Sequence, residues 1–176
     1  MRRILLGVAA LAVIALAVYW FALRGSSTTT AGAQPSHAVA QIGEGDTVIV
    51  VGDDGKLMGT ASGKSKTSLP VLPLKQRPRG DRVRGHVLEE VHVLAAAPKP
   101  LRRYVARTAY GETGVEVETG SGIEIRFGDE REAARKWKAA AAVLADPSVT
   151  LLSYVDVSAP TRPALGGEEH ELPPAS

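Results

Sequence analysis

The sequence predicts an α+β fold, in which an antiparallel β-sheet is covered by two helices on one face. Two hairpin patterns of alternating apolar residues, two amphipathic helical stretches and short connections between them lead to this prediction. With 176 residues, the chain has room for one modest domain and accessory segments. We expect a cytoplasmic N-terminus and anchor at 1–24, a flexible linker at 25–41, a domain at 42–163 and a disordered tail at 164–176.

The N-terminal stretch 4–23 carries no charge and is long enough to cross a bilayer as a helix. Arg2 and Arg3 precede it and Arg24 follows, a bias that favours a cytoplasmic N-terminus. The small residues 31–33 resemble a signal-peptidase site, but the apolar stretch is longer than the core of a signal peptide. An uncleaved single-pass anchor in the plasma membrane is therefore favoured over a cleaved signal. In both cases the domain is extracytoplasmic.

The first half of the domain combines one hairpin, a proline-rich segment and a helix. Two apolar runs within 46–62 flank Asp53-Asp54-Gly55, which predicts a hairpin. Prolines then interrupt 68–85, so we expect an extended surface path there. Apolar residues three and four apart predict a helix within 81–97, and a strand is expected at 101–110.

The second half of the domain shows a clearer pattern of a hairpin, a helix and a strand. The stretch 114–128 alternates apolar and charged residues around Gly120-Ser121-Gly122, which predicts a hairpin with one wet face. Asp129 is expected to cap the next helix, with Glu132 completing a capping box. A final strand is expected at 149–160. A chain-terminal strand often lies at a sheet edge, where it can accept a partner strand, although an ordinary solvated strand fits the pattern equally.

No group of residues points to catalysis. The chain has no cysteine, and its four histidines are scattered over the tether, the first helix and the tail. Neither a phosphate-binding loop nor a nucleophile elbow is present. A net charge of +2 with 5% aromatic residues does not favour nucleic-acid binding. We therefore expect no enzyme activity, catalytic residue, metal, cofactor or small-molecule substrate.

One basic run remains without an assigned role. Seven Lys and Arg residues lie between 64 and 84, with one acidic residue among them. The run could contact anionic lipid headgroups or wall polymers, whereas a solvated loop is the simpler interpretation.

Taken in order, these stretches resemble the β-domain of the bacterial cell-division proteins FtsQ and DivIB over about 46–165. The likeness is carried by VIVVGDDGKLMGTA, LPVLPL, VLAAAPKPLRRYV, GVEVETGSGIEIRFGDEREAARKWKAAAAVLAD and SYVDVSAPTRPALG. Within them, Phe127-Gly128, Lys136 or Lys138, Val143-Leu144 and 154–157 fall at positions of the family's pattern.

The resemblance implies a non-enzymatic, single-pass protein of the divisome that acts during septum formation. Its implied partners are small bitopic division proteins of the FtsB/DivIC and FtsL type, which extend the sheet at the end of the β-domain. Carried to this chain, the partner-binding positions fall on Tyr154, Val155, Asp156, Ser158, Arg162 and Leu165.

The family also places a POTRA domain before the β-domain, and the residues between Leu23 and Asp46 are too few for one. The resemblance therefore covers the β-domain and does not extend to the recruitment role that the family assigns to the POTRA domain. The alternative function, suggested by the basic run, is an anchored or secreted envelope domain that binds cell-wall polymer.

Overall fold

The computed structural model describes residues 36–62 and 68–172, and these contain nine strands and three helices. The predicted anchor at 4–23 lies outside the described residues. Within the described ranges, no helix is long and apolar enough to cross a membrane. The elements are β1 (Ala38–Ile42), β2 (Thr47–Gly52), β3 (Leu57–Ser62), β4 (Val71–Leu72), α2 (His86–Ala95), α3 (Lys99–Arg102), β5 (Val105–Gly111), β6 (Gly114–Thr119), β7 (Glu124–Gly128), α4 (Ala133–Leu144), β8 (Leu151–Asp156) and β9 (Ala164–Glu171).

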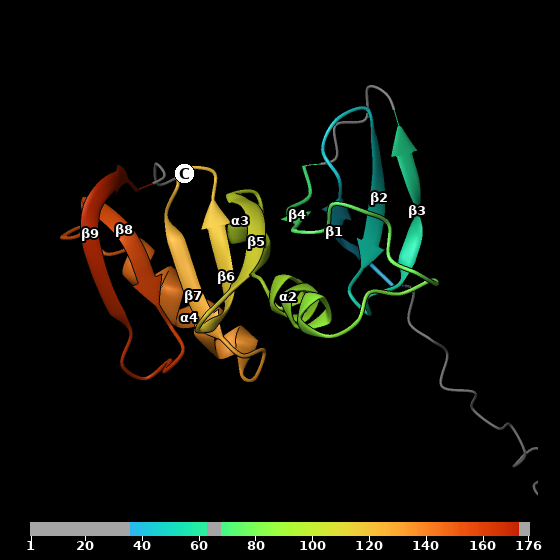
Figure 1. Cartoon of the computed structure of the whole chain (residues 1–176). Coiled ribbons are helices and arrows are strands. Elements are labelled where there is room, and N and C mark those ends of the chain that lie inside the picture. Colours follow the sequence, from blue (N-terminus) through green and yellow to red (C-terminus); the bar gives the residue numbers. More distant parts are fainter. Residues whose placement is uncertain (1–35, 63–67, 173–176) are drawn as a thin grey trace, which may run out of the picture. The chain divides into compact units, whose positions relative to one another are not determined.

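All nine strands belong to one sheet in the order β3-β2-β1-β4-β5-β6-β7-β8-β9 (Figure 1). The predicted hairpins are confirmed as β2–β3 and β6–β7. The expectation of a purely antiparallel sheet is wrong, because β1–β4, β4–β5 and β7–β8 are parallel pairs. Helices join β4 to β5 and β7 to β8, and such a crossover returns the chain to the same end of the sheet. The fold is therefore α+β with a mixed sheet.

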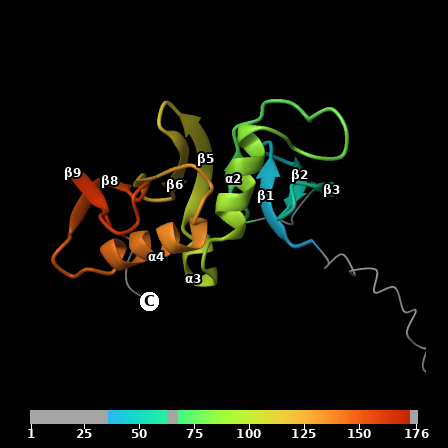
Figure 2. The same cartoon turned by 90° about the horizontal axis from the view of Figure 1, so that it is seen from below.

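The two long helices cover one face of the sheet, as predicted (Figure 2). Helix α2 packs on β1, β5 and β6, and α4 packs on β7 and β8. Alternate residues of β6 and β7 are buried beneath them, including Val115, Val117, Ile125 and Phe127. The charged residues between them are partly exposed on the opposite face.

Trp137 of α4 lies at the centre of this core. It is 1% exposed, and its ring centroid lies 4.8 Å from that of Phe127 on β7. Its indole N–H donates a 2.7 Å hydrogen bond to the carbonyl of Val93 on α2. One side chain thus fills the apolar layer and joins both helices, while its polar atom remains satisfied.

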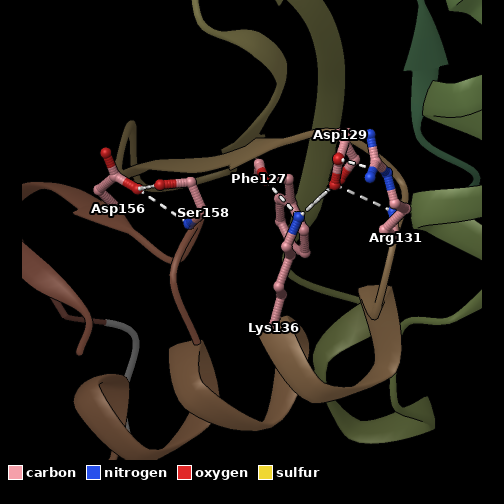
Figure 3. Close-up of polar contacts among 6 residues, drawn as sticks. All are labelled: Phe127, Asp129, Arg131, Lys136, Asp156 and Ser158. Carbon is pink, nitrogen blue, oxygen red and sulfur yellow. Dashed lines mark hydrogen bonds and ion pairs between the residues drawn. The ribbon is translucent and has the colours of Figure 1, made fainter. Parts of the chain in front are cut away.

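The turn between β7 and α4 is organised by Lys136 (Figure 3). This lysine is 4% exposed, and its Nζ donates to the Phe127 carbonyl (2.9 Å), the Asp129 carbonyl (3.0 Å) and Asp129 Oδ1 (2.7 Å). Three acceptors satisfy the three donors of the buried ammonium. Of the two lysines at the family position, Lys136 is therefore the internal one, whereas Lys138 is exposed.

The predicted capping box of Asp129 and Glu132 is wrong, because Asp129 is occupied by hydrogen bonds within this turn. Asp129 Oδ1 accepts the Lys136 ammonium and the Arg131 N–H, so this carboxylate serves the turn and does not cap a helix. Helix α4 begins later, at Ala133, and no side chain caps it. Glu132, at the N-cap position, has φ of +54°.

Parts of both segments that were predicted to be flexible form strands. Part of the predicted linker forms β1, which pairs with β2 and β4. Part of the predicted tail forms β9, which pairs with β8. In each case an unpaired strand edge nearby supplies backbone hydrogen bonds that the local sequence pattern does not reveal. The remaining parts, 25–35 and 173–176, lie outside the described residues.

We expect Lys136→Met to lower the free energy of unfolding by about 2 kcal/mol, because Phe127, Asp129 and the turn lose a buried charged donor. Lys138→Met, on the exposed side of the same helix, is the matched control and should change stability little. Urea unfolding followed by circular dichroism measures both. Equal stability of the two variants would contradict the role given to Lys136.

The Lys136 effect should also depend on pH. Its hydrogen bond is the main reason why the pKa of the Asp129 carboxyl lies below its usual 3.8. A carboxyl with a lowered folded-state pKa contributes stability above its unfolded pKa and loses it as the pH falls through the folded value. The stability gap between the wild type and Lys136→Met should therefore be full at neutral pH and shrink below about pH 4. A gap that stays constant down to pH 2.5 would contradict this assignment.

Candidate functional site

The described residues provide no convergent catalytic centre. His86 packs against the Tyr110 ring, and His92 contacts the Glu130 carboxylate. Within 36–62 and 68–172, no three His, Asp or Glu residues lie close enough together to hold a metal ion.

Glu90 of α2 is the most unusual titratable group in the described chain. It is fully buried, and Thr108 on β5 donates a 2.5 Å hydrogen bond to its Oε2, while Oε1 has no partner. Burial raises the pKa of this carboxyl. Glu90 lines neither the hollow of about 340 Å³ beside Ala38 nor that of about 250 Å³ beside Leu74. A substrate in either hollow would not meet it, so the carboxyl belongs to the α2–β5 contact.

Four of the six predicted partner-binding residues are held within the domain. Strand β8 lies between β7 and β9, so the expectation that it forms the sheet edge is wrong. Val155 is 0% exposed. The Arg126 guanidinium lies over the Tyr154 ring, 4.2 Å from its centroid. Asp156 Oδ1 accepts the backbone N–H (2.9 Å) and the hydroxyl (2.6 Å) of Ser158 (Figure 3).

The other two residues, Arg162 and Leu165, are exposed. Leu165 lies on β9 and has 48% of its surface accessible, which is unusual for a large apolar side chain in a strand. Arg162 lies in the connection from β8 to β9. The predicted set therefore divides into four residues that contact neighbouring strands or the turn after β8, of which only Val155 is buried, and two exposed residues on or just before β9.

Strand β9 is the feature that sequence reasoning missed. Its two central glycines make the pairing possible, because a Cβ on Gly167 would lie 2.0 Å from Ser153 Oγ, and one on Gly166 would lie 3.0 Å from the Tyr154 hydroxyl. Gly167 also has φ of +79°, a region that favours glycine. A glycine pair followed by glutamates is typical of a disordered tail, so the local pattern did not indicate a strand.

Beyond β9 the sheet ends. The outer margin of β9 carries Glu168, Glu169 and Glu171, which are exposed. The Glu169 N–H points inward and donates to Ser153 Oγ at 3.3 Å. The register of β9 against β8 shifts between Leu152 and Tyr154, so Glu168 lies in an irregular stretch, and the extra residue of such a bulge is left unpaired. We call this margin, 164–171, the β9 edge.

The open face of the sheet is covered by ion pairs. Arg107 on β5 pairs with Glu118 on β6 at 3.0 Å, and Arg126 pairs with Glu124 on β7 at 2.5 Å. The hydrogen bond from Arg126 to Glu124 raises the pKa of the guanidinium, and burial raises the pKa of the neighbouring Glu116. Paired charges of both signs leave this face without a dominant field for a charged ligand.

None of the curated proteins compared with this chain matches it. Residues 38–158 match the family model described as cell division protein FtsQ/DivIB, C-terminal. The matched region runs from the start of β1 to just past β8, and β9 follows it. It covers more than half of the chain, so the chain belongs to the FtsQ/DivIB family of non-enzymatic cell-division proteins.

Proposed function

We propose that this protein is a membrane-anchored scaffold of the divisome that binds small bitopic division proteins of the FtsB/DivIC and FtsL type through the β9 edge. Family membership supports the scaffold role in cell division. The observation that carries the binding proposal is the position of β9, which ends the sheet with no strand beyond it in the described chain.

Strand addition is the binding mode that suits such an edge. A partner segment in extended conformation would complete the hydrogen bonds of the outward backbone groups, and alternate side chains would select the partner. Leu165 offers an apolar contact, while Glu168 and Glu171 favour basic residues on the partner. Arg162 lies just before the strand, where it can pair with a partner carboxylate.

The other four residues of the predicted set, on β8 and in the turn after it, then have a supporting role. Tyr154 and Ser153 of β8 contact the two glycines of β9, and the Asp156–Ser158 contacts fix the turn that follows β8. We propose that they hold the β9 edge in position without touching the partner.

Anchoring by 4–23 completes the proposal. The uncharged stretch and its flanking arginines support a single span with the domain outside the cytoplasm. The residues after it lead to β1 over a short distance, so the domain would remain close to the membrane and the β9 edge would be available to partners in the same membrane.

A fluorescent fusion of the full chain is expected to concentrate at the division septum, because partner binding would retain it there. Deletion of 164–172 should spread the signal over the envelope while leaving the fusion in the membrane fraction. A uniform signal from the intact fusion in dividing cells would contradict the scaffold proposal.

The binding mode can be tested at Glu168. Glu168→Pro removes one backbone N–H of the β9 edge and restricts the backbone there, which should lower partner affinity at least about tenfold. Glu168→Ala removes the side chain and keeps the N–H, so it is the matched control and should bind within about threefold of the wild type. Co-purification of small single-pass division proteins from membranes, and titration of the captured partner, measure both variants. If Glu168→Pro unfolds like the wild type and still captures the partner, strand addition at this edge is wrong.

A further inference from the structure

The loop between β4 and α2 carries a concentration of positive charge that partner binding at β9 does not use. It spans 73–85 and contains one acidic residue, Asp81. We call it the basic loop, and its cationic residues are Lys75, Arg77, Arg79, Arg82 and Arg84.

The backbone of the basic loop is fixed to the β2–β3 turn. The Leu57 N–H donates to the Asp81 carbonyl at 2.7 Å, and the Val83 N–H donates to the Gly55 carbonyl at 2.9 Å. Val83 itself is 2% exposed. Pro73 and Pro78 further restrict the backbone. The charges are therefore presented by an ordered segment, which reduces the entropy lost when they bind.

Most of these charges have no counterpart among the described residues. Lys75, Arg77, Arg79 and Arg84 are exposed, and none has an ion pair or hydrogen bond to another residue that the structure describes. Arg82 differs, because its guanidinium binds the Asp54 carboxylate at 3.1 Å and the Asp54 carbonyl at 2.9 Å. The loop thus offers four uncompensated cations beside one that attaches it to the sheet.

Asp54 also connects the basic loop to Ser36, the first described residue. Ser36 Oγ donates to Asp54 Oδ1 and to Asp53 Oδ1, both at 2.9 Å. Arg24 follows the apolar stretch, and only residues 25–35 lie between Arg24 and Ser36. At roughly 3.5 Å per residue, they can separate the domain from the bilayer by at most about 40 Å. The basic loop therefore lies on the part of the domain that is tied most closely to the predicted anchor.

We propose that the basic loop binds the anionic phospholipid headgroups of the membrane surface that faces the domain. Arginine and lysine on a membrane-adjacent segment are attracted to anionic headgroups, and arginine forms bidentate hydrogen bonds with phosphate. This proposal rests on the anchoring part of the proposed function and is independent of partner binding.

The sheet order gives this contact a consequence for function. The basic loop is attached to the turn between β2 and β3, and β3 and β9 are the two ends of the nine-stranded sheet. With strands about 4.8 Å apart, the two ends are separated by roughly 35–40 Å along the sheet. A lipid contact at one end would hold the domain in one orientation and leave the β9 edge free for partners.

The test uses the full chain in vesicles and takes advantage of its lack of cysteine. Gln76→Cys, in the basic loop, and Glu168→Cys, on β9, each provide a single site for a donor fluorophore. The vesicles contain an acceptor on the headgroups and are made of phosphatidylcholine alone or with phosphatidylglycerol. Energy transfer from position 76 should rise when phosphatidylglycerol is present, and transfer from position 168 should not. The gain should disappear in 1 M salt, where the screening length falls to about 3 Å.

Charge reversal supplies the second arm. Arg77→Glu, Arg79→Glu and Arg84→Glu together leave Arg82 on Asp54, and should weaken the lipid contact at least about 100-fold, at roughly fivefold per removed charge. The matched control reverses three exposed cations elsewhere, Lys99, Arg135 and Lys138, and should keep the gain. Thermal unfolding confirms that both triple variants are folded.

The outcomes separate the loop from the anchor. If the chain does not float with neutral vesicles, the proposed anchor is wrong, and flotation with phosphatidylglycerol vesicles then tests the loop alone. The lipid proposal is overturned if phosphatidylglycerol changes neither the energy transfer from position 76 nor the flotation of the chain. It is also overturned if the triple basic-loop variant shows the same gain in energy transfer as the wild type. Loss of binding to purified cell wall by that variant, without any lipid effect, would also overturn it and assign the loop to wall polymer.

Discussion

The ammonium of Lys136 binds two backbone carbonyls and one carboxylate at the point where β7 turns into α4. This contact sets where α4 begins and aligns the helix so that Trp137 packs against Phe127 and reaches the Val93 carbonyl. The crossover through α4 brings β8 parallel to β7. The position of β8 in turn allows β9 to pair on its outer side. The edge proposed for partner binding therefore depends on a buried lysine on another element.

The domain divides its surface in a way that suits a scaffold. One face of the sheet is covered by helices and forms the core, and the other is covered by paired charges. Burial of the Glu90 carboxyl lowers the stability of the core, since its one described hydrogen-bond partner is the Thr108 hydroxyl. Recognition is left to strand edges and loops, where backbone groups and unpaired charges remain available.

Local sequence patterns predicted the elements that local interactions define. Alternation gave the β6–β7 hairpin, Asp53-Asp54-Gly55 gave the β2–β3 turn, and three- and four-residue spacing gave α2 and α4. The short helix α3 was missed, and a strand was expected from residue 101 instead. The strands that were missed, β1, β4 and β9, are short or rich in small and charged residues. Their hydrogen bonds are made with neighbouring strands of the sheet, so composition alone would assign these segments to a linker, a loop and a tail.

The sequence by itself determined the α+β class, the wet and buried faces of the central hairpin, the order of elements that indicates the FtsQ/DivIB family and the basic run. Only the tertiary structure decided which strand ends the sheet, which lysine is buried and which arginines of the basic loop lack a partner among the described residues. The reason is physical: periodicity records which side of an element avoids water, whereas strand order and charge pairing depend on contacts between residues far apart in the chain. The proposed interface is consequently on β9 and not on β8. Strand β9 pairs outside β8, although the alternating sequence pattern ends with β8.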